Sequence, residues 1–306
     1  MATAIRGSGV DDIERHYAPR AAGRATPARD CDKNSGVPVI ETDSGTLSLE
    51  ERGDGPPVVF VSGWAMSRTC WGPVVERLSK RYRCITYDPR GCGRSLVRPT
   101  VSFELEDHAD DLLAVCNATD ALDAHIVGHE LGGRVAAVAV RMHPQIAQTV
   151  TLVGWWGAAR IEEAMGEVAK FRQAASLLLQ DLGSFPVFRN LVAWSYRRVP
   201  EPHRTKLFDE FSQLDARVAY STAVAASDPA AAVTFDEAVA RLAMPVLLVQ
   251  GGDDREAARE GLRGMFRRLE HVDLATIHGS GPLPMLEHPD AFARTLGQFF
   301  GEHGSR

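Results

Sequence analysis

Glu130 is the residue whose type and setting point most directly to chemistry in this chain. It lies in the segment Gly-His-Glu-Leu-Gly-Gly that begins at Gly128, where a serine would be the more usual central residue. The glycine spacing predicts a sharp strand-to-helix turn that projects the central side chain into a cleft, with the first N–H groups of the helix aimed at the same place. A carboxylate there can act as an acid, as a base or as a nucleophile that forms an ester.

Short apolar runs supply the elements that would position Glu130. They are rich in Val and Ile, are separated by helical patterns, and lie at 58–61, 84–87, 125–128, 149–153 and 246–250. Such runs are typical of a parallel sheet that is covered by helices on both faces. The turn at Glu130 would then join one of these strands to a helix over 134–142.

Charge and size limit the classes of function. A chain of 306 residues with 44% hydrophobic content can form one large core and an additional insertion. The net charge of −6, without a cluster of Lys or Arg, argues against nucleic acid and anionic membranes as partners. We expect a small-molecule substrate, and a homodimer is possible.

Cysteine usage and the N-terminus limit the site and the compartment. The five cysteines lack C-x-x-C spacing, so neither a disulfide framework nor a zinc site is expected, and no other metal or cofactor is implied. The N-terminus lacks the apolar core of a secretory signal, and no stretch reaches the ~18 to 20 apolar residues of a membrane helix. We therefore expect a cytoplasmic protein.

Five motifs in order resemble the α/β-hydrolase family over roughly residues 38–301. They are an oxyanion loop at 58–64, a D-x-R-G-x-G-x-S turn at 88–95, the nucleophile elbow at 128–133, a G-x-x-D segment at 251–254 and a closing segment at 279–289. The resemblance implies an α/β-hydrolase fold, with a mostly parallel sheet, helices on both faces and an inserted helical cap. The elbow is most similar to the G-H-D-x-G-G of haloalkane and haloacid dehalogenases and epoxide hydrolases.

The catalytic triad of that family is altered at two of its three positions. Glu130 stands at the nucleophile and Pro282 at the histidine, whereas Asp254 keeps the acid. His278 lies four residues before Pro282 and could approach the cleft from the end of the last strand. The alternative is that His278 only hydrogen-bonds to the backbone there, and that Asp254 is a leftover loop carboxylate.

The resemblance also suggests which residues contact the substrate. The oxyanion hole would consist of the backbone N–H groups of Trp64 and Leu131, which do not depend on side-chain identity. His129 would lie beside the substrate or have a structural role. Trp155 and Trp156 follow a predicted strand, as Trp64 does, and the carboxyl ends of strands in an open α/β sheet face the binding crevice. Indoles at these strand ends would suit a flat, unsaturated substrate.

The chain divides into three predicted parts. Residues 1–36 are rich in Ala, Arg, Gly and Asp without a sustained period and are interpreted as an N-terminal extension that is mobile or forms an arm on the core. Residues 37–156 and 240–306 would form the α/β-hydrolase core. Residues 157–239 break the alternation of strands and helices, and they match the position of the family's helical cap.

The missing histidine favours non-hydrolytic chemistry as the first hypothesis. Glu130 would transfer protons in an elimination, decarboxylation, carbon–carbon cleavage or cyclisation of a small carbonyl-bearing biosynthetic intermediate, as a lyase or cyclase does. One alternative is a hydrolase with Glu130 as nucleophile or water-activating base on an epoxide, halide or ester. A second alternative is a binding protein that uses the cap cavity without turnover.

Overall fold

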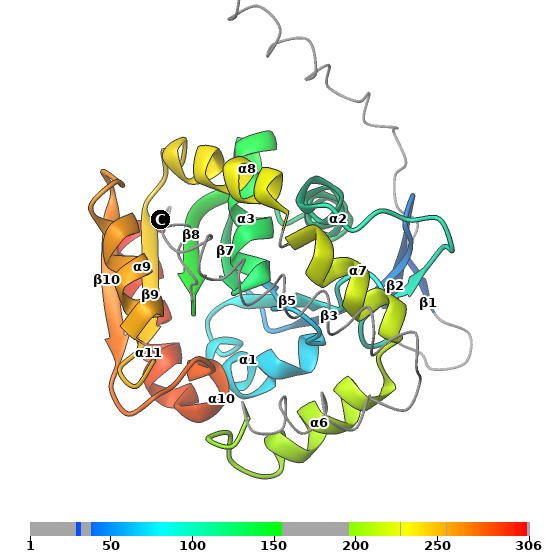
Figure 1. The fold of residues 1–306 in the computed structure, drawn as a ribbon. Coiled ribbons are helices and arrows are strands. Elements are labelled where there is room, and N and C mark those ends of the chain that lie inside the picture. The colour runs from blue at the N-terminus through cyan, green and yellow to red at the C-terminus, as the bar shows by residue number, and fades with distance from the viewer. Residues whose placement is uncertain (1–28, 32–37, 155–195, 227, 255, 305–306) are drawn as a thin grey trace, which may run out of the picture.

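A mixed sheet flanked by helices forms the centre of the molecule (Figure 1). The computed structural model describes residues 29–31, 38–154, 196–226, 228–254 and 256–304. The strands are β1 (Arg29–Cys31), β2 (Pro38–Thr42), β3 (Gly45–Arg52), β4 (Pro57–Val61), β5 (Arg83–Tyr87), β6 (Leu96–Val97), β7 (Ala124–His129), β8 (Ala147–Val153), β9 (Val246–Gly251) and β10 (Val272–Ile277).

The strand order is β1-β2-β3-β5-β4-β7-β8-β9-β10, and β6 pairs with β3. Strands β5, β4, β7, β8, β9 and β10 pair in parallel, whereas β1, β2 and β3 are antiparallel to their neighbours. Each of the five apolar runs in the sequence lies on one of the parallel strands. The predicted mostly parallel α/β-hydrolase sheet is therefore confirmed.

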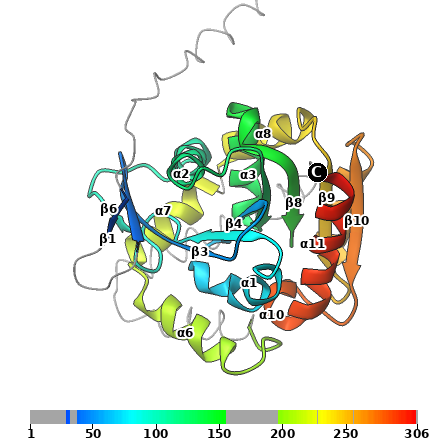
Figure 2. The same cartoon turned by 180° about the vertical axis from the view of Figure 1, so that it is seen from behind.

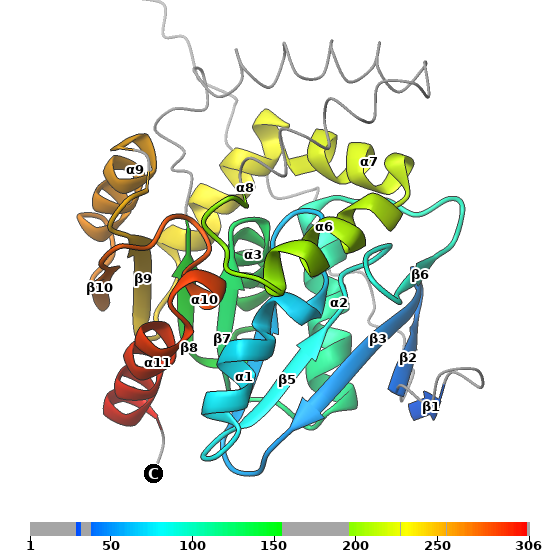
Figure 3. The ribbon, with the colours of Figure 1, turned by 90° about the horizontal axis from the view of Figure 1, so that it is seen from below.

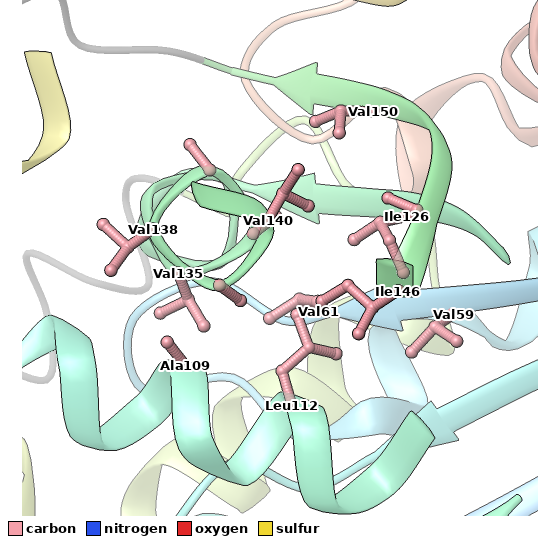
Figure 4. Packing of buried hydrophobic residues seen from close by; sticks show 14 of the residues in the cluster. Val59, Val61, Ala109, Leu112, Ile126, Val135, Val138, Val140, Ile146 and Val150 are labelled. Atoms are coloured by element: carbon pink, nitrogen blue, oxygen red, sulfur yellow. The ribbon is translucent and has the colours of Figure 1, made fainter. Parts of the chain in front are cut away.

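Both faces of the parallel strands are buried, because alternate residues pack into different hydrophobic clusters. In β4, Val59 and Val61 pack on one face with Ile126 and Val150 (Figure 4), whereas Phe60 packs on the other. Side chains of a strand alternate between faces, so a continuous apolar run is what burial on both faces requires.

Helices from different parts of the chain cover the two faces (Figure 2). One face is covered by α2 (Leu105–Ala118), α3 (Leu131–Met142) and α9 (Glu256–Phe266), and the other by α1 (Gly72–Leu78), α10 (Pro284–Glu287) and α11 (Pro289–His303). Short 3-10 helices span Arg68–Trp71 and Pro144–Ile146. Within the described residues, no helix is long and apolar enough to cross a membrane.

Three helices of the predicted cap range lie together above the sheet in the view of Figure 3. They are α6 (His203–Gln213), α7 (Ala216–Ala226) and α8 (Pro229–Ala240). The last of them packs against α3, and its Phe235 belongs to the same buried cluster as the sheet. Thus α8, although all but its last residue lies within 157–239, covers the core.

Three residues of the N-terminal segment lie on the edge of the sheet. β1 lies inside the segment 1–36 and pairs antiparallel with β2, in a register that joins Arg29 to Ile40 and Cys31 to Pro38. These three residues extend the edge of the sheet. Backbone pairing alone can add such a strand to an edge, so the sequence needs no apolar alternation to signal it.

Candidate active site

The turn at Glu130 has the strained geometry of a nucleophile elbow. Glu130 has φ 50° and ψ −112°, an unusual conformation for a residue with a side chain. Its N–H donates to the carbonyl oxygen of Val153 at 2.9 Å, which ties the turn to the end of β8. A Cβ on Gly132 would lie 2.2 Å from the carbonyl oxygen of Val61, so only glycine lets α3 begin this close to β4.

The carboxylate of Glu130 is half-buried beside the loop that follows β4. Burial raises its pKa from 4.5 to about 7, against the opposing effects of the Arg134 guanidinium and of a hydrogen bond from the backbone N–H of Trp64. Arg134 lies one turn along α3 and donates to the carbonyl oxygen of Ala226 at 2.6 Å. Glu130 can therefore exchange a proton near neutral pH, as a general acid or base must.

The expected oxyanion hole takes a different form in the structure. The N–H of Trp64, which would donate to a substrate oxygen, already donates to Glu130. Leu131 is the first residue of α3, where backbone N–H groups have no carbonyl partner within the helix. Of the two predicted donors, the N–H of Trp64 is thus bonded to the carboxylate of Glu130, whereas the N–H of Leu131 has no carbonyl partner within α3.

Ser62, which directly follows β4, holds the oxyanion loop in shape through its hydroxyl. The indole N–H of Trp71 donates to its Oγ at 3.2 Å, and this hydroxyl donates in turn to the carbonyl oxygen of Ser67 at 3.2 Å. Both Ser62 and Trp71 are buried. The hydroxyl therefore connects the end of β4 to the far end of the loop.

His129 is buried next to Glu130 and is neutral. Its Nε2 lies 2.9 Å from the carbonyl oxygen of Pro282, and burial lowers its pKa to about 4. A Cβ on Gly63 would lie 2.6 Å from Nδ1 of His129 and 3.2 Å from Oε2 of Glu130, so both atoms border the same backbone position. Nδ1 has no hydrogen-bond partner in the described part of the chain.

The loop that carries Pro282 is held by a buried carboxylate. Glu287 accepts the N–H of Gly281 at 2.7 Å and the N–H of Leu283 at 3.2 Å. The guanidinium of Arg198 lies 3.3 Å from Glu287 and also donates to the carbonyl oxygen of Gly279 at 2.9 Å. Hydrogen bonds therefore fix this loop, and the carbonyl oxygen of Pro282 lies next to Nε2 of His129.

Asp254 and His278 follow the ends of β9 and β10, as Glu130 follows the end of β7. Among the described contacts, neither side chain contacts Glu130. The carboxylate of Asp254 is buried and accepts the N–H of Gly251 at 2.8 Å, and burial raises its pKa to about 6. The side chain of His278 is exposed just after β10. A catalytic role for either residue stays a prediction.

A small pocket lies between the oxyanion loop, the start of α3 and the cap helix α7. Its lining residues include Trp64, Leu131, His108, Arg90 and Thr222. The guanidinium of Arg90 is held 2.7 Å from Asp111, and both side chains are buried. Two of its lining residues, Trp64 and Leu131, are the residues predicted to supply the oxyanion hole.

Two tryptophans predicted to contact substrate, Trp155 and Trp156, lie outside the described residues. No group of His, Cys, Asp and Glu side chains suited to a metal ion occurs in the described segments.

Two residues on the cap side, Tyr196 and Glu210, lie near the site although no sequence motif indicated them. Tyr196 lies close enough to Glu130 for that charge to raise the tyrosine pKa, although burial is the larger cause, and Glu210 bonds to the oxyanion loop. Neither stands in a motif, so only their spatial position could reveal them.

The parallel sheet and the elbow at Glu130 define the class of the protein. Residues 56–289 match the model of the alpha/beta hydrolase fold family, and the chain belongs to this family. The predicted resemblance is confirmed.

Relatives support the same assignment. A 2-(acetamidomethylene)succinate hydrolase of Mesorhizobium japonicum is 25% identical over 240 residues, which cover 77% of this chain and 84% of the relative. RutD of Caulobacter vibrioides, named as a carbamate hydrolase, is 24% identical over 249 residues, or 79% and 89% of the two chains. The structure of a thermophilic esterase from Thermogutta terrifontis superposes with a TM-score of 0.72 at 21% identity, over 92% of this chain and 100% of that chain. At this identity the structural likeness supports the fold alone.

Proposed function

We propose that this protein is a hydrolase in which Glu130 is the base that activates water for attack on an ester-type carbonyl of a small molecule. The observation that carries the proposal is the half-buried elbow carboxylate with a pKa of about 7. A base whose pKa lies near the working pH combines a useful ionised fraction with a useful affinity for the proton.

The reaction needs only groups that surround Glu130. A water molecule gives a proton to the carboxylate as its oxygen bonds to the carbonyl carbon, and the carbonyl oxygen becomes an oxyanion. The N–H of Leu131 at the start of α3 stabilises that charge. Protonated Glu130 is a weaker acceptor, so the N–H of Trp64 can turn from Glu130 to the oxyanion. The oxyanion then re-forms the carbonyl as the bond from carbon to the leaving oxygen breaks, and that oxygen takes the proton from Glu130, which yields an acid and an alcohol.

Direct attack by water accounts for the missing histidine better than a covalent intermediate does. An ester on Glu130 would need a second base for its hydrolysis. Asp254 and His278 make no described contact with Glu130, and Nδ1 of His129 is closed off from solvent. A mechanism in which water attacks the substrate directly requires one base only, and that base is Glu130.

The named relatives also favour hydrolysis. Two of them carry the names of hydrolases, and the names give no support to the lyase or cyclase chemistry that we placed first from the sequence. We therefore place the hydrolytic alternative first. Elimination or cyclisation by the same carboxylate becomes an outcome that the experiment can reveal.

A single-turnover experiment in ¹⁸O-water tests the proposal. A panel of small esters, lactones, amides, carbamates and epoxides is screened first, and the best substrate is then mixed with excess enzyme. We expect one labelled oxygen in the product acid and none in the peptide that contains Glu130. Label in Glu130 would show the nucleophile mechanism, and turnover without addition of water would contradict hydrolysis.

Two variants complete the test. Glu130→Gln should reduce kcat/KM by about a hundredfold or more, since a general base contributes on the order of 10² to 10⁴. Glu237→Gln, a change of the same kind at an exposed position on α8, serves as the control and should leave kcat/KM unchanged. For the wild type, kcat/KM should increase with pH through about 7, because the base must be ionised.

A further inference from the structure

The oxyanion loop is held from the cap side by one carboxylate. Glu210 on α6 accepts the hydroxyl of Ser67 at 2.6 Å and the hydroxyl of Thr69 at 2.7 Å. Ser67 is buried and also caps the 3-10 helix that ends the loop, by accepting the N–H of Thr69. Three hydrogen-bonding groups thus meet at the junction of the cap and the loop.

The cap also contacts the other end of this loop, at Trp64. The indole N–H of Trp64 donates to the carbonyl oxygen of Ala219 on α7 at 3.1 Å. Its ring meets that of Phe211, the neighbour of Glu210 on α6, edge to face with 6.2 Å between the centroids. Both α6 and α7 therefore contact the side chain of Trp64.

The position of the backbone of Trp64 matters because its N–H donates to the carboxylate of Glu130. We propose that Glu210 is a positioning residue that, through Ser67 and Thr69, keeps the N–H of Trp64 on the carboxylate of Glu130. The mechanistic importance of this role rests on the proposed function, in which Glu130 is the base. Through their contacts with the oxyanion loop, the cap helices then adjust the proton affinity of Glu130 in addition to covering the site.

Glu210 acts through these hydrogen bonds, whereas other groups act on Glu130 directly. Among the residues that the structure describes, the charged or titratable groups around Glu130 are Arg134 on its own helix, His129 on β7 and Tyr196 from the cap side. The charge of Glu210 is felt instead by Asp88, Cys70 and Tyr196. Loss of the Glu210 bonds should release the loop, and loss of the Trp64 donor should raise the pKa of Glu130 further.

Infrared difference spectroscopy can follow Glu130 without a substrate. The carboxyl bands of each protein are recorded against pH, and the spectrum of the same protein with Glu130→Gln is subtracted. Glu210→Ala should move the titration of Glu130 upward by about one pH unit, as expected when a carboxylate loses a hydrogen-bond donor. Glu210→Gln keeps an oxygen acceptor for the two hydroxyls and should restore most of the wild-type titration.

The control is Asp209→Ala, which removes an exposed acid at the neighbouring position on α6 and should leave the titration unchanged. If Glu210→Ala does not fold, Thr69→Val removes one of the same bonds and should move the titration in the same direction by a smaller amount. An unchanged or lowered pKa of Glu130 in Glu210→Ala, or in Thr69→Val where that variant must replace it, would overturn the positioning role.

Kinetics separate this inference from the proposed function. If Glu130 is the base, Glu210→Ala should reduce kcat/KM about tenfold at a pH below 7 and much less at high pH, because ionisation is only shifted. A shifted infrared titration in a protein that hydrolyses nothing would support the positioning role and contradict the proposed function. Hydrolysis by a protein in which Glu210→Ala leaves the titration of Glu130 unshifted would contradict the positioning role and leave the proposed function standing.

Discussion

Relative to the wild type, the variant Glu130→Gln is expected to be more stable at alkaline pH than it is in acid. The pKa of this carboxyl rises from 4.5 to about 7 on folding, and burial is the main cause. The folded state therefore binds the proton more tightly than the unfolded state does. The free energy of unfolding should decrease as pH rises from 4.5 to 7, and the full penalty is present above that range.

The size of the penalty follows from the same two pKa values. A difference of this magnitude corresponds to about 3 kcal/mol, since one unit is worth ~1.4 kcal/mol. Gln removes the buried charge but leaves a polar amide in the same place, and a buried polar group with an imperfect partner costs about 1 to 3 kcal/mol at every pH. The pH-dependent part of the change is therefore the informative quantity.

Urea unfolding of the wild type and of Glu130→Gln at about pH 5 and about pH 8.5 measures this quantity. The variant should gain about 2.6 kcal/mol relative to the wild type between these two conditions. Glu237→Gln, at an exposed site, is the matched control and should show no such gain. A stability difference between Glu130→Gln and wild type that does not vary with pH would refute the claim that burial raises the pKa of Glu130.

Three further substitutions test the geometry around the elbow. Gly132→Ala should lower the free energy of unfolding by about 3 kcal/mol or more and abolish activity, because its Cβ would lie 2.2 Å from the carbonyl oxygen of Val61; a well-folded, active variant would contradict the close approach. Glu287→Ala should cost about 3 kcal/mol in urea unfolding, since it leaves Arg198 and two backbone donors without this buried acceptor, and Glu287→Gln should cost less. His278→Ala should leave kcat/KM within about twofold, a change of ~0.4 kcal/mol, because the side chain is exposed; a loss near a thousandfold would restore it to the mechanism.

The sequence by itself determined the sheet, the elbow and the family. Apolar runs such as 58–61 and 246–250 can satisfy their backbone groups and bury both faces only within a covered parallel sheet, so local composition sufficed to place them. The glycines at 128 and 132 likewise predicted the turn that projects Glu130, because no other residue allows so close an approach of backbones. The short strand β1 was missed, since three residues of edge pairing leave no pattern in the side chains.

Only the tertiary structure decided what surrounds Glu130. The N–H of Trp64, the carbonyl oxygen of Pro282 and the carboxylate of Glu210 come from distant parts of the chain, and no motif states which way a backbone group points. The pKa of Glu130 depends on the balance between burial and these donors, and that balance exists only when the cap, the oxyanion loop and α3 lie together. A sequence can therefore show that a carboxylate occupies the elbow, whereas its proton affinity is a property of the folded neighbourhood.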